Sequence, residues 1–477
     1  MSTTAPAASD DTRIDPAVWR IAAAVLTGAL AVIFDTTIVA VALHTLATEL
    51  HTSVATIQWV STGYLLALAV TIPITGWLQR VLGAKRLWIA ALAIFLIGSI
   101  LSSLAWSASS LIAFRIVQGV GGGIMLPLMS TLVMQAAGGK NLGRIMSVVS
   151  LPAVLGPVLG PLLGGVILEH LHWSFLFWVN VPFCVVGLVL AVVLMPKDGP
   201  TTRAPFDIVG FILMAPGLVG VLYGLSNTSR DGGFGRADAM WPLIGGLVLL
   251  VAFVLWALRR KARALVDVLL LRHWPLASSS LLLSLSGIAL YGAMLLLPLY
   301  FQQLRGMSAL AAGALLIPQG VGTFFSRSIA GRLSDTMGSR WLSVAGFALT
   351  AVSTVPFAYA TGTTNEVWLM VALLFRGFGL GMVTMPLMAL AFRGLERAEV
   401  PDASIISRIA TQVGGAFGTA VLAVILEGAL ASAHTPGAAA DAFQGAFWWT
   451  VGFAAFGAVL SLMLPGKPAE VAAAPAR

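Results

Sequence analysis

The sequence contains few charged residues and a single cysteine. Only 10% of its 477 residues are charged, while 58% are hydrophobic and the mean hydropathy is +0.94. A water-soluble fold of this length could not bury so much apolar side chain, because the surface of a globule must be largely wetted. Cys184 lies alone in an apolar run, which excludes a disulfide framework and a thiol metal cluster. The composition therefore predicts an integral membrane protein.

The sequence also lacks the motifs of several functional classes. The six histidines are scattered, no span contains paired acids, and no Ser/His dyad is evident, which argues against an intramembrane enzyme. The phosphate-binding motif Gly-x-x-x-x-Gly-Lys-Ser/Thr is missing, which argues against a nucleotide-driven pump. Residues 1–18 contain three aspartates and one arginine, unlike a signal peptide. We expect no metal, no cofactor and no nucleic-acid partner, since the net charge of +8 comes mostly from short loops.

Long apolar runs dominate the chain. A membrane-spanning helix needs roughly 20 predominantly apolar residues, and fourteen stretches qualify. Proline interrupts or opens the seventh and eighth, at Pro216 and Pro242. The sequence therefore predicts an all-α integral membrane protein with fourteen transmembrane helices. The predicted spans are residues 19–44, 57–78, 87–106, 111–134, 142–168, 175–195, 206–225, 241–258, 276–301, 310–329, 341–359, 367–391, 405–430 and 443–464.

The basic residues gather in alternate loops. If the N-terminus is cytoplasmic, 22 of the 27 Lys and Arg residues fall on the cytoplasmic side, as expected for cytoplasmic loops. Removing one span would invert every later loop and destroy this bias. The bias therefore predicts an even number of spans, with cytoplasmic tails at residues 1–18 and 465–477. The exceptions are Arg230, Arg236 and Arg305 outside, and Arg115 and Arg376 within the outer parts of spans.

The second half of the chain repeats the first. Phe-Arg115, glycines and a Met-Leu-Pro-Leu-Met run match Phe-Arg376, glycines and Thr-Met-Pro-Leu-Met. Val-Ile-Leu-Glu169 similarly matches Val-Ile-Leu-Glu427. Two six-helix halves with an axis along the membrane normal are the plan of a secondary transporter, with the substrate between the halves. The predicted units are a bundle at 19–195, a linker with two extra helices at 196–275, and a bundle at 276–464.

Short motifs mark the spans of the first half. They are Asp35-Thr-Thr-Ile-Val-Ala-Val-Ala-Leu, Gln58-Trp59-Val-Ser-Thr-Gly-Tyr64, the loop from Gly76 through Gly83 to Arg86, Arg115-x-x-Gln118-Gly119, Gly156-Pro157-x-x-Gly160-Pro161-x-x-Gly164-Gly165, and Asn180-Val-Pro182. Together they resemble the major facilitator superfamily, and within it the fourteen-span drug:proton antiporter group. The resemblance covers nearly the whole chain. One departure is that Gln79 or Arg80 replaces the acid usual in the loop motif, whereas the second-half copy keeps Asp335.

This resemblance implies a fold and a function. The fold would be the major facilitator fold, with two six-helix bundles plus two additional central helices. The function would be proton-coupled export of lipophilic, cationic drugs or toxic compounds across the cell (inner, cytoplasmic) membrane by alternating access. The alternative is export of an endogenous lipid or metabolite, with drug efflux incidental. The expected partners are a small lipophilic substrate, protons and membrane lipids, and we expect a monomer driven by the proton gradient.

Asp35 is the strongest candidate for proton coupling. It lies nine residues before His44 on an outward-running span, roughly 13 Å from the outer end. Intramembrane acids are costly and usually serve ion or proton pathways. The alternative is a structural aspartate held by the hydroxyls of Thr36 and Thr37. The corresponding second-half region, residues 290–297, contains no acid, so the packing scheme alone does not require one.

Arg115 and Glu427 are the other candidates for proton coupling. Arg115 lies about five residues, or roughly 7 Å, from the outer end of its span, at the level of the outer leaflet that also holds Asp35. A neighbouring arginine favours the ionised carboxylate and can respond to its protonation. The alternative is an arginine that only snorkels to the interface. Glu427 is either a second proton site or an interfacial acid like its repeat mate Glu169.

Two further groups are predicted to serve conformational change. The fifth-span residues Gly156, Pro157, Gly160, Pro161, Gly164 and Gly165 indicate a closely packed, bendable helix, with static packing as the alternative. The loop residues Gly76, Gly83 and Arg86, with Asp335 in the second half, would close the cytoplasmic side, although their charges could simply set topology.

Aromatic and amide side chains within the spans are candidates for the substrate cavity. An aromatic cavity with one carboxylate would suit lipophilic cations through charge and cation–π contact. The alternative for each aromatic residue is a lipid-facing or core position. The candidates are Phe34, Gln58, Trp59, Tyr64, Tyr291 and Tyr300.

Overall fold

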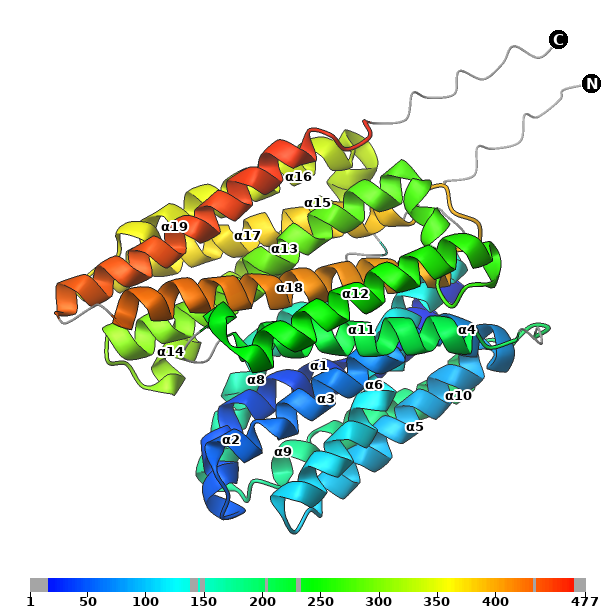
Figure 1. The fold of residues 1–477 in the computed structure, drawn as a ribbon, viewed down its shortest axis with the longest axis horizontal. Coiled ribbons are helices and arrows are strands. Elements are labelled where there is room, and N and C mark those ends of the chain that lie inside the picture. Colours follow the sequence, from blue (N-terminus) through cyan, green and yellow to red (C-terminus); the bar gives the residue numbers. More distant parts are fainter. Residues whose placement is uncertain are drawn as a thin grey trace, which may run out of the picture.

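The protein is a bundle of long helices. The computed structural model describes residues 16–137, 145, 151–201, 205–228, 233–431 and 435–466, and these ranges contain helices and connecting segments but no strand. The helices form two bundles, with α11 and α12 between them (Figure 1).

The first bundle is built on close helix contacts. α1 packs against α8 and α10, and α6 packs against both α3 and α5. A Cβ atom at Gly121 of α6 would lie 2.6 Å from the carbonyl oxygen of Ala91 on α5, so only glycine permits this backbone approach. The helices are α1 (Pro16–Glu49), α2 (Val54–Ile57), α3 (Trp59–Thr71), α4 (Thr75–Leu82), α5 (Ala84–Ser103), α6 (Ala108–Ala137), α8 (Leu151–His170), α9 (Phe175–Trp178) and α10 (Asn180–Leu194).

The second bundle repeats this arrangement. α13 packs against α18 as α1 packs against α8, and α17 packs against both α15 and α16 as α6 packs against α3 and α5. Its elements are α13 (Trp274–Leu299), η4 (Tyr300–Leu304), α14 (Ala309–Leu315), α15 (Ile317–Met337), α16 (Ser339–Thr354), η5 (Val355–Tyr359), α17 (Glu366–Ala391), α18 (Val400–Ala431) and α19 (Pro436–Ser461).

The linker helix α11 contacts both bundles along one seam, and α12 packs against α11. The ring of Tyr223 on α11 lies 5.9 Å from the ring of Trp59 on α3, centroid to centroid. On the other side, Val221 and Leu225 pack with Ala420 of α18. α11 therefore covers a boundary between the halves. The linker elements are α11 (Ile208–Asn227), η1 (Gly233–Gly235), α12 (Ala237–Arg260), η2 (Lys261–Arg263) and η3 (Val268–Arg272).

A buried aspartate holds the ends of the linker helices together. Asp207 caps α11 by accepting the backbone N–H of Gly210 at 3.1 Å. The same carboxylate accepts the indole N–H of Trp256 on α12 at 3.0 Å and the backbone N–H of Leu265 at 3.0 Å. Charge-assisted hydrogen bonds of this kind are stronger than neutral ones. Asp207 thus orients α12 and the following linker against the start of α11.

The described part of each of the fourteen predicted spans coincides with a helix or a helix pair, but fourteen crossings are not confirmed. In the described ranges, eleven helices are long and apolar enough to cross a membrane, and the pair α3–α4, bent by 57°, would make a twelfth. The fifth predicted span begins outside the described ranges. The tenth is divided between α14 and α15, and α15 carries arginines and an aspartate that make it less apolar than the other spans.

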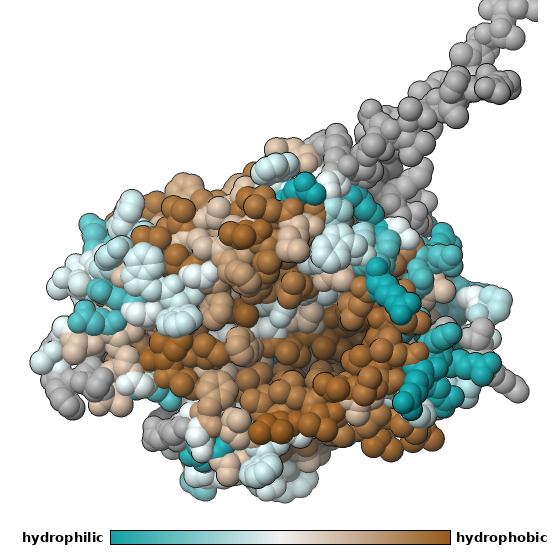
Figure 2. Space-filling view, turned by 45° about the horizontal axis from the view of Figure 1, so that its top comes forward, coloured by the Kyte–Doolittle hydropathy of each residue, from teal (hydrophilic) through white to brown (hydrophobic). Residues whose placement is uncertain are grey.

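The exterior is largely apolar, as a membrane protein requires. Figure 2 shows a broad hydrophobic area across the middle of one face, with hydrophilic residues toward its ends. On α12, the side chains of Val248 and Val251 are 61% and 60% exposed. Such an apolar belt matches the hydrocarbon layer of a bilayer.

Candidate functional site

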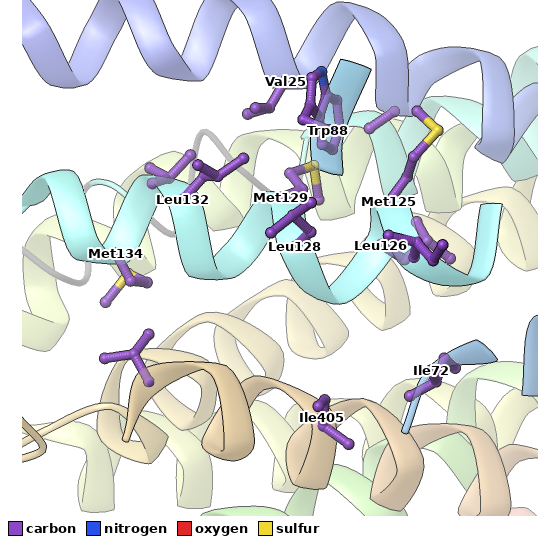
Figure 3. Close-up of a cluster of buried hydrophobic side chains, with 14 of the residues drawn as sticks. Val25, Ile72, Trp88, Met125, Leu126, Leu128, Met129, Leu132, Met134 and Ile405 are labelled. Carbon is purple, nitrogen blue, oxygen red and sulfur yellow. The ribbon is translucent and has the colours of Figure 1, made fainter. Parts of the chain in front are cut away.

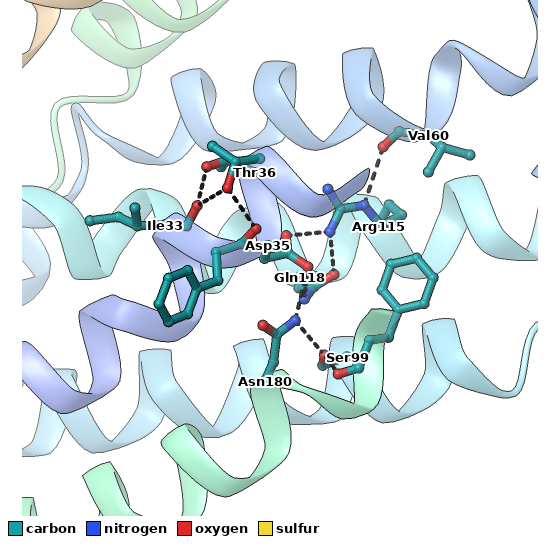
Figure 4. A network of polar contacts seen from close by, with 11 residues as sticks. Ile33, Asp35, Thr36, Val60, Ser99, Arg115, Gln118 and Asn180 are labelled. Carbon is teal, nitrogen blue, oxygen red and sulfur yellow. Dashed lines mark hydrogen bonds and ion pairs between the residues drawn. The ribbon is translucent and has the colours of Figure 1, made fainter. Parts of the chain in front are cut away.

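Asp35 lies at the centre of a buried polar network in the first bundle. It is fully buried on α1, and its Oδ2 accepts from the Arg115 Nη1 of α6 in an ion pair (Figure 4). Its Oδ1 accepts from Gln118 Nε2 and from Asn180 Nδ2, both at 2.9 Å. All three partners are at least 99% buried. The two charges therefore neutralise each other in a site shielded from water and lipid.

Arg115 is held from several sides. Its Nη1 also donates to Gln118 Oε1 at 2.6 Å, and its Nε donates to the Val60 carbonyl oxygen at 3.3 Å. Its guanidinium carbon lies 4.1 Å from the centre of the Tyr64 ring, a cation–π contact. The guanidinium is thus fixed inside the bundle, which contradicts the alternative of an arginine that only snorkels to the interface.

Sequence analysis did not select Gln118, Asn180 and Ser99 as site residues, although two of them occur in the quoted motifs. Asn180 donates to Ser99 Oγ at 3.0 Å as well as to Asp35, and Ser99 donates to the Phe177 carbonyl oxygen at 2.9 Å. The available signal was an isolated amide within an apolar run. Buried polar groups require partners, so each such amide indicates a polar neighbour on another helix.

The hydroxyl groups next to Asp35 make local bonds instead of supporting the carboxylate. Thr36 Oγ1 donates to the Ile33 carbonyl oxygen at 2.8 Å, and Thr37 Oγ1 donates to the carbonyl oxygens of Ile33 and Phe34 at 3.1 Å. Neither hydroxyl bonds to Asp35. The alternative in which these threonines hold the aspartate is therefore wrong.

The fifth-span motif packs against the segment of α1 that carries Asp35. Cβ atoms added at Gly156 and Gly160 of α8 would collide with Ile33 and Thr37, and one at Gly164 would lie 3.3 Å from the Ile38 carbonyl oxygen. The glycines thus allow α8 to approach α1 around Asp35. Gly165 is half-buried, and the side chains of Pro157 and Pro161 lie outside those described.

The second bundle has a buried arginine without an acid. Arg376 on α17 is 1% exposed and donates to Gln319 Oε1 at 2.9 Å, Thr354 Oγ1 at 3.1 Å and the Ala289 carbonyl oxygen at 2.7 Å. No carboxylate pairs with it among the described residues. The repeat therefore preserves the arginine, whereas the ion pair occurs only in the first bundle among the described side chains.

The two bundles meet where α4 and α6 approach the start of α18. Arg80 Nη1 lies 3.8 Å from Asp402 Oδ1, and Thr131 Oγ1 lies 2.9 Å from Ser404 Oγ. A Cβ at Gly76 would lie 3.1 Å from Asp402 Oδ1, so the loop glycine permits this approach. The acid missing from the loop motif is thus replaced in space by Asp402 on the opposite bundle.

A second acid orders the loop between α4 and α5. Asp198 Oδ1 accepts the backbone N–H of Lys85 at 2.7 Å, and Oδ2 accepts that of Arg86 at 3.1 Å. Gly83 has φ of +88° and faces the Asp198 carboxylate, where a Cβ would collide. Gly83 and Arg86 therefore act through the backbone here. Asp335 lies in α15, but its side chain is outside those described.

The proposed cavity residues do not form one group. Tyr64 lies on Arg115, and Phe34 lies 5.5 Å from the Phe183 ring, both inside the first bundle. Tyr300 is fully buried in an aromatic cluster of the second bundle and donates to the Thr361 carbonyl oxygen at 2.7 Å. Trp59, 40% exposed, contacts α11.

The remaining candidates lie apart from the Asp35 network. Gln58 is exposed, Tyr291 packs beside Gly415, and Glu427 is exposed near the end of α18. Within the described ranges, no group of three or more His, Cys, Asp or Glu side chains is arranged to hold a metal ion.

The relationship to known proteins agrees with this architecture. Residues 25–419 match the family profile described as Major Facilitator Superfamily. The chain belongs to the major facilitator superfamily. It is 34% identical over 416 residues to the multidrug resistance protein B homolog of Mycobacterium tuberculosis, covering 87% of this chain and 77% of its relative. It is 31% identical over 394 residues to the lincomycin resistance protein LmrB of Bacillus subtilis, covering 82% of each.

Solved structures of the superfamily share the fold. The human organic anion transporter MFSD10 (TETRAN) superimposes with a TM-score of 0.66 at 16% identity, covering 94% of this chain and all of the other. The proton:xylose symporter XylE superimposes with a TM-score of 0.61 at 15% identity, covering 92% and 95%. As a member of this superfamily, the chain is a multi-pass membrane transporter.

Proposed function

We propose that this transporter is an antiporter that exports lipophilic compounds in exchange for protons, with Asp35 as the proton-carrying group. The supporting observation is the fully buried ion pair between Asp35 and Arg115. In the described helices of the first bundle, Asp35 is the only acid that lies more than one turn from a helix end. The proton gradient would drive transport without a cofactor.

The pair can couple protonation to a change of shape. Protonation of Asp35 removes the counter-ion of Arg115 and leaves a buried cation, which is costly in a site without water. The network then relaxes by moving α1 against α6, and the glycine face of α8 transmits this movement because it packs directly around Asp35. Deprotonation restores the pair. Two alternating arrangements of the bundles follow from these two states.

The nature of the cargo is the finer part of the proposal. Lipophilic compounds fit the likeness to multidrug and lincomycin resistance proteins. The preference for cations stays a prediction; it rests on aromatic residues together with one carboxylate, and that carboxylate is paired with Arg115. Export of an endogenous lipid or metabolite is the alternative, and both would use the same coupling step. We place the N- and C-termini and the Arg80–Asp402 contact on the cytoplasmic side, following the distribution of basic residues.

The experiment is transport by the purified full-length chain in liposomes with an imposed pH gradient. Ethidium and lincomycin serve as probes. We expect Asp35→Asn to abolish gradient-driven uptake while probe binding to the protein persists. Glu169→Gln is the matched control, because Glu169 is an exposed acid at the end of α8 in the same bundle. Gradient-driven uptake that is undiminished by Asp35→Asn would exclude Asp35 as the proton carrier.

A further inference from the structure

An arginine on α18, at the seam between the bundles, has no partner among the described residues. Arg408 is half-buried on α18, eight residues or about 12 Å from the start of the helix at Val400. Its Nε is buried without a hydrogen-bond partner. Among the described residues, its guanidinium forms no hydrogen bond and no ion pair. By contrast, the buried arginines Arg115 and Arg376 each donate several hydrogen bonds to described acceptors.

The helix geometry directs Arg408 toward the first bundle. Residues three and four positions apart share one face of a helix. Ser404 on that face contacts Thr131 of α6, and Ile405 lies against Gly76. Arg408 is one turn farther along, just beyond the contact between the bundles. Its guanidinium is also close enough to act electrostatically on the Tyr64 side chain of the opposite bundle.

Ile405, one turn before Arg408, belongs to a buried apolar cluster, and the described acids Asp402 and Asp35 already have arginine partners. Figure 3 shows Ile405 in the same apolar cluster as Leu126 and Leu128 of α6. The nearest acid along α18, Asp402, lies six residues or about 9 Å away along the axis and is paired with Arg80. Asp35 is paired with Arg115. A guanidinium in such a place is costly unless an anion joins it.

We propose that Arg408 binds the anionic oxygen group of an amphipathic substrate, such as a carboxylate or phosphate monoester carrying an apolar tail. The guanidinium presents paired N–H donors that match these groups, and the apolar seam accommodates the tail. This inference rests on the proposed export function and names its substrate class. It favours amphipathic anions over the lipophilic cations expected from sequence.

The test is binding by the full-length chain in phosphatidylcholine nanodiscs, measured by calorimetry. The probes are decyl phosphate and decyltrimethylammonium, which share the same tail and differ in charge. We expect tighter binding of decyl phosphate. Arg408→Gln should weaken its binding about tenfold or more and leave decyltrimethylammonium unchanged. Arg408→Lys should retain part of the affinity, which separates loss of charge from misfolding. Arg272→Gln, at an exposed linker arginine, is the matched control.

Two outcomes would overturn the inference. One is equal or tighter binding of decyltrimethylammonium by the unmodified protein. The other is an affinity for decyl phosphate that Arg408→Gln changes no more than Arg272→Gln does. Adding phosphatidylglycerol distinguishes the sources of the anion, since competition indicates a lipid headgroup and its absence indicates a free solute. Proton-driven export that persists while anion binding fails would overturn this inference alone.

Discussion

Removing the charge of Asp35 should destabilise the protein, chiefly because Arg115 is left as a buried charge without a counter-ion. The carboxylate of Asp35 accepts from three buried donors, on Arg115, Gln118 and Asn180. An asparagine in either orientation turns its own amide N–H groups toward at least one of these donors. Breaking a buried ion pair by removing one partner typically costs about 3–5 kcal/mol, because the remaining charge is uncompensated. We expect Asp35→Asn to lower the free energy of unfolding by about this amount.

A double-mutant cycle isolates the pair from other effects. Arg115→Gln alone leaves a buried carboxylate, whereas Asp35→Asn with Arg115→Gln leaves no buried charge. We therefore expect the double variant to be more stable than either single variant. Unfolding by sodium dodecyl sulfate in mixed micelles, followed by tryptophan fluorescence, gives the four free energies. Additive losses in the double variant would refute the view that these two charges stabilise each other.

Two further changes test the contacts around the loop between α4 and α5. Arg80→Asp should oppose Asp402 and open this end of the seam, with about 1 kcal/mol of effect, and Asp402→Arg in the same chain should restore it. Labelling of a cysteine introduced at Ser404 reports the opening, and equal labelling of the swapped pair and the single variant would contradict the contact. Asp198→Ala should cost about 1 kcal/mol by removing the cap on the first amides of α5, measured by the same unfolding titration. An unchanged unfolding midpoint would show that this cap contributes nothing.

The membrane environment of this protein and the positions of its helices along the chain could be predicted from the sequence. Apolar runs are local features, so the described part of each predicted span coincides with a helix or helix pair despite the prolines at Pro216 and Pro242. The number of helices that cross the membrane could not be predicted from the sequence, because it depends on how broken segments such as α14 and α15 lie in the bilayer. Asp35 could also be singled out as an isolated acid in an apolar run that needs polar partners, and its role in proton coupling stays a prediction.

The partners of these residues were decided by tertiary structure. Asp35 meets Arg115 across 80 residues of chain and Asn180 across 145, and no local pattern encodes which helix faces meet. The acid missing from the loop motif proved to be present as Asp402, across the seam between the bundles.

Composition and apolar runs therefore determined the membrane class and the helices, because burial in lipid acts on each segment separately, and the short motifs carried the resemblance to the family. Only the packed helices decided which charges are paired, as Asp35 and Arg115 are, and which, like Arg408, have no partner among the described residues. Pairing depends on the rotation and approach of several helices at once. The expectation of cationic substrates combined aromatic residues, one carboxylate and the family resemblance, whereas only the packed helices paired that carboxylate with Arg115.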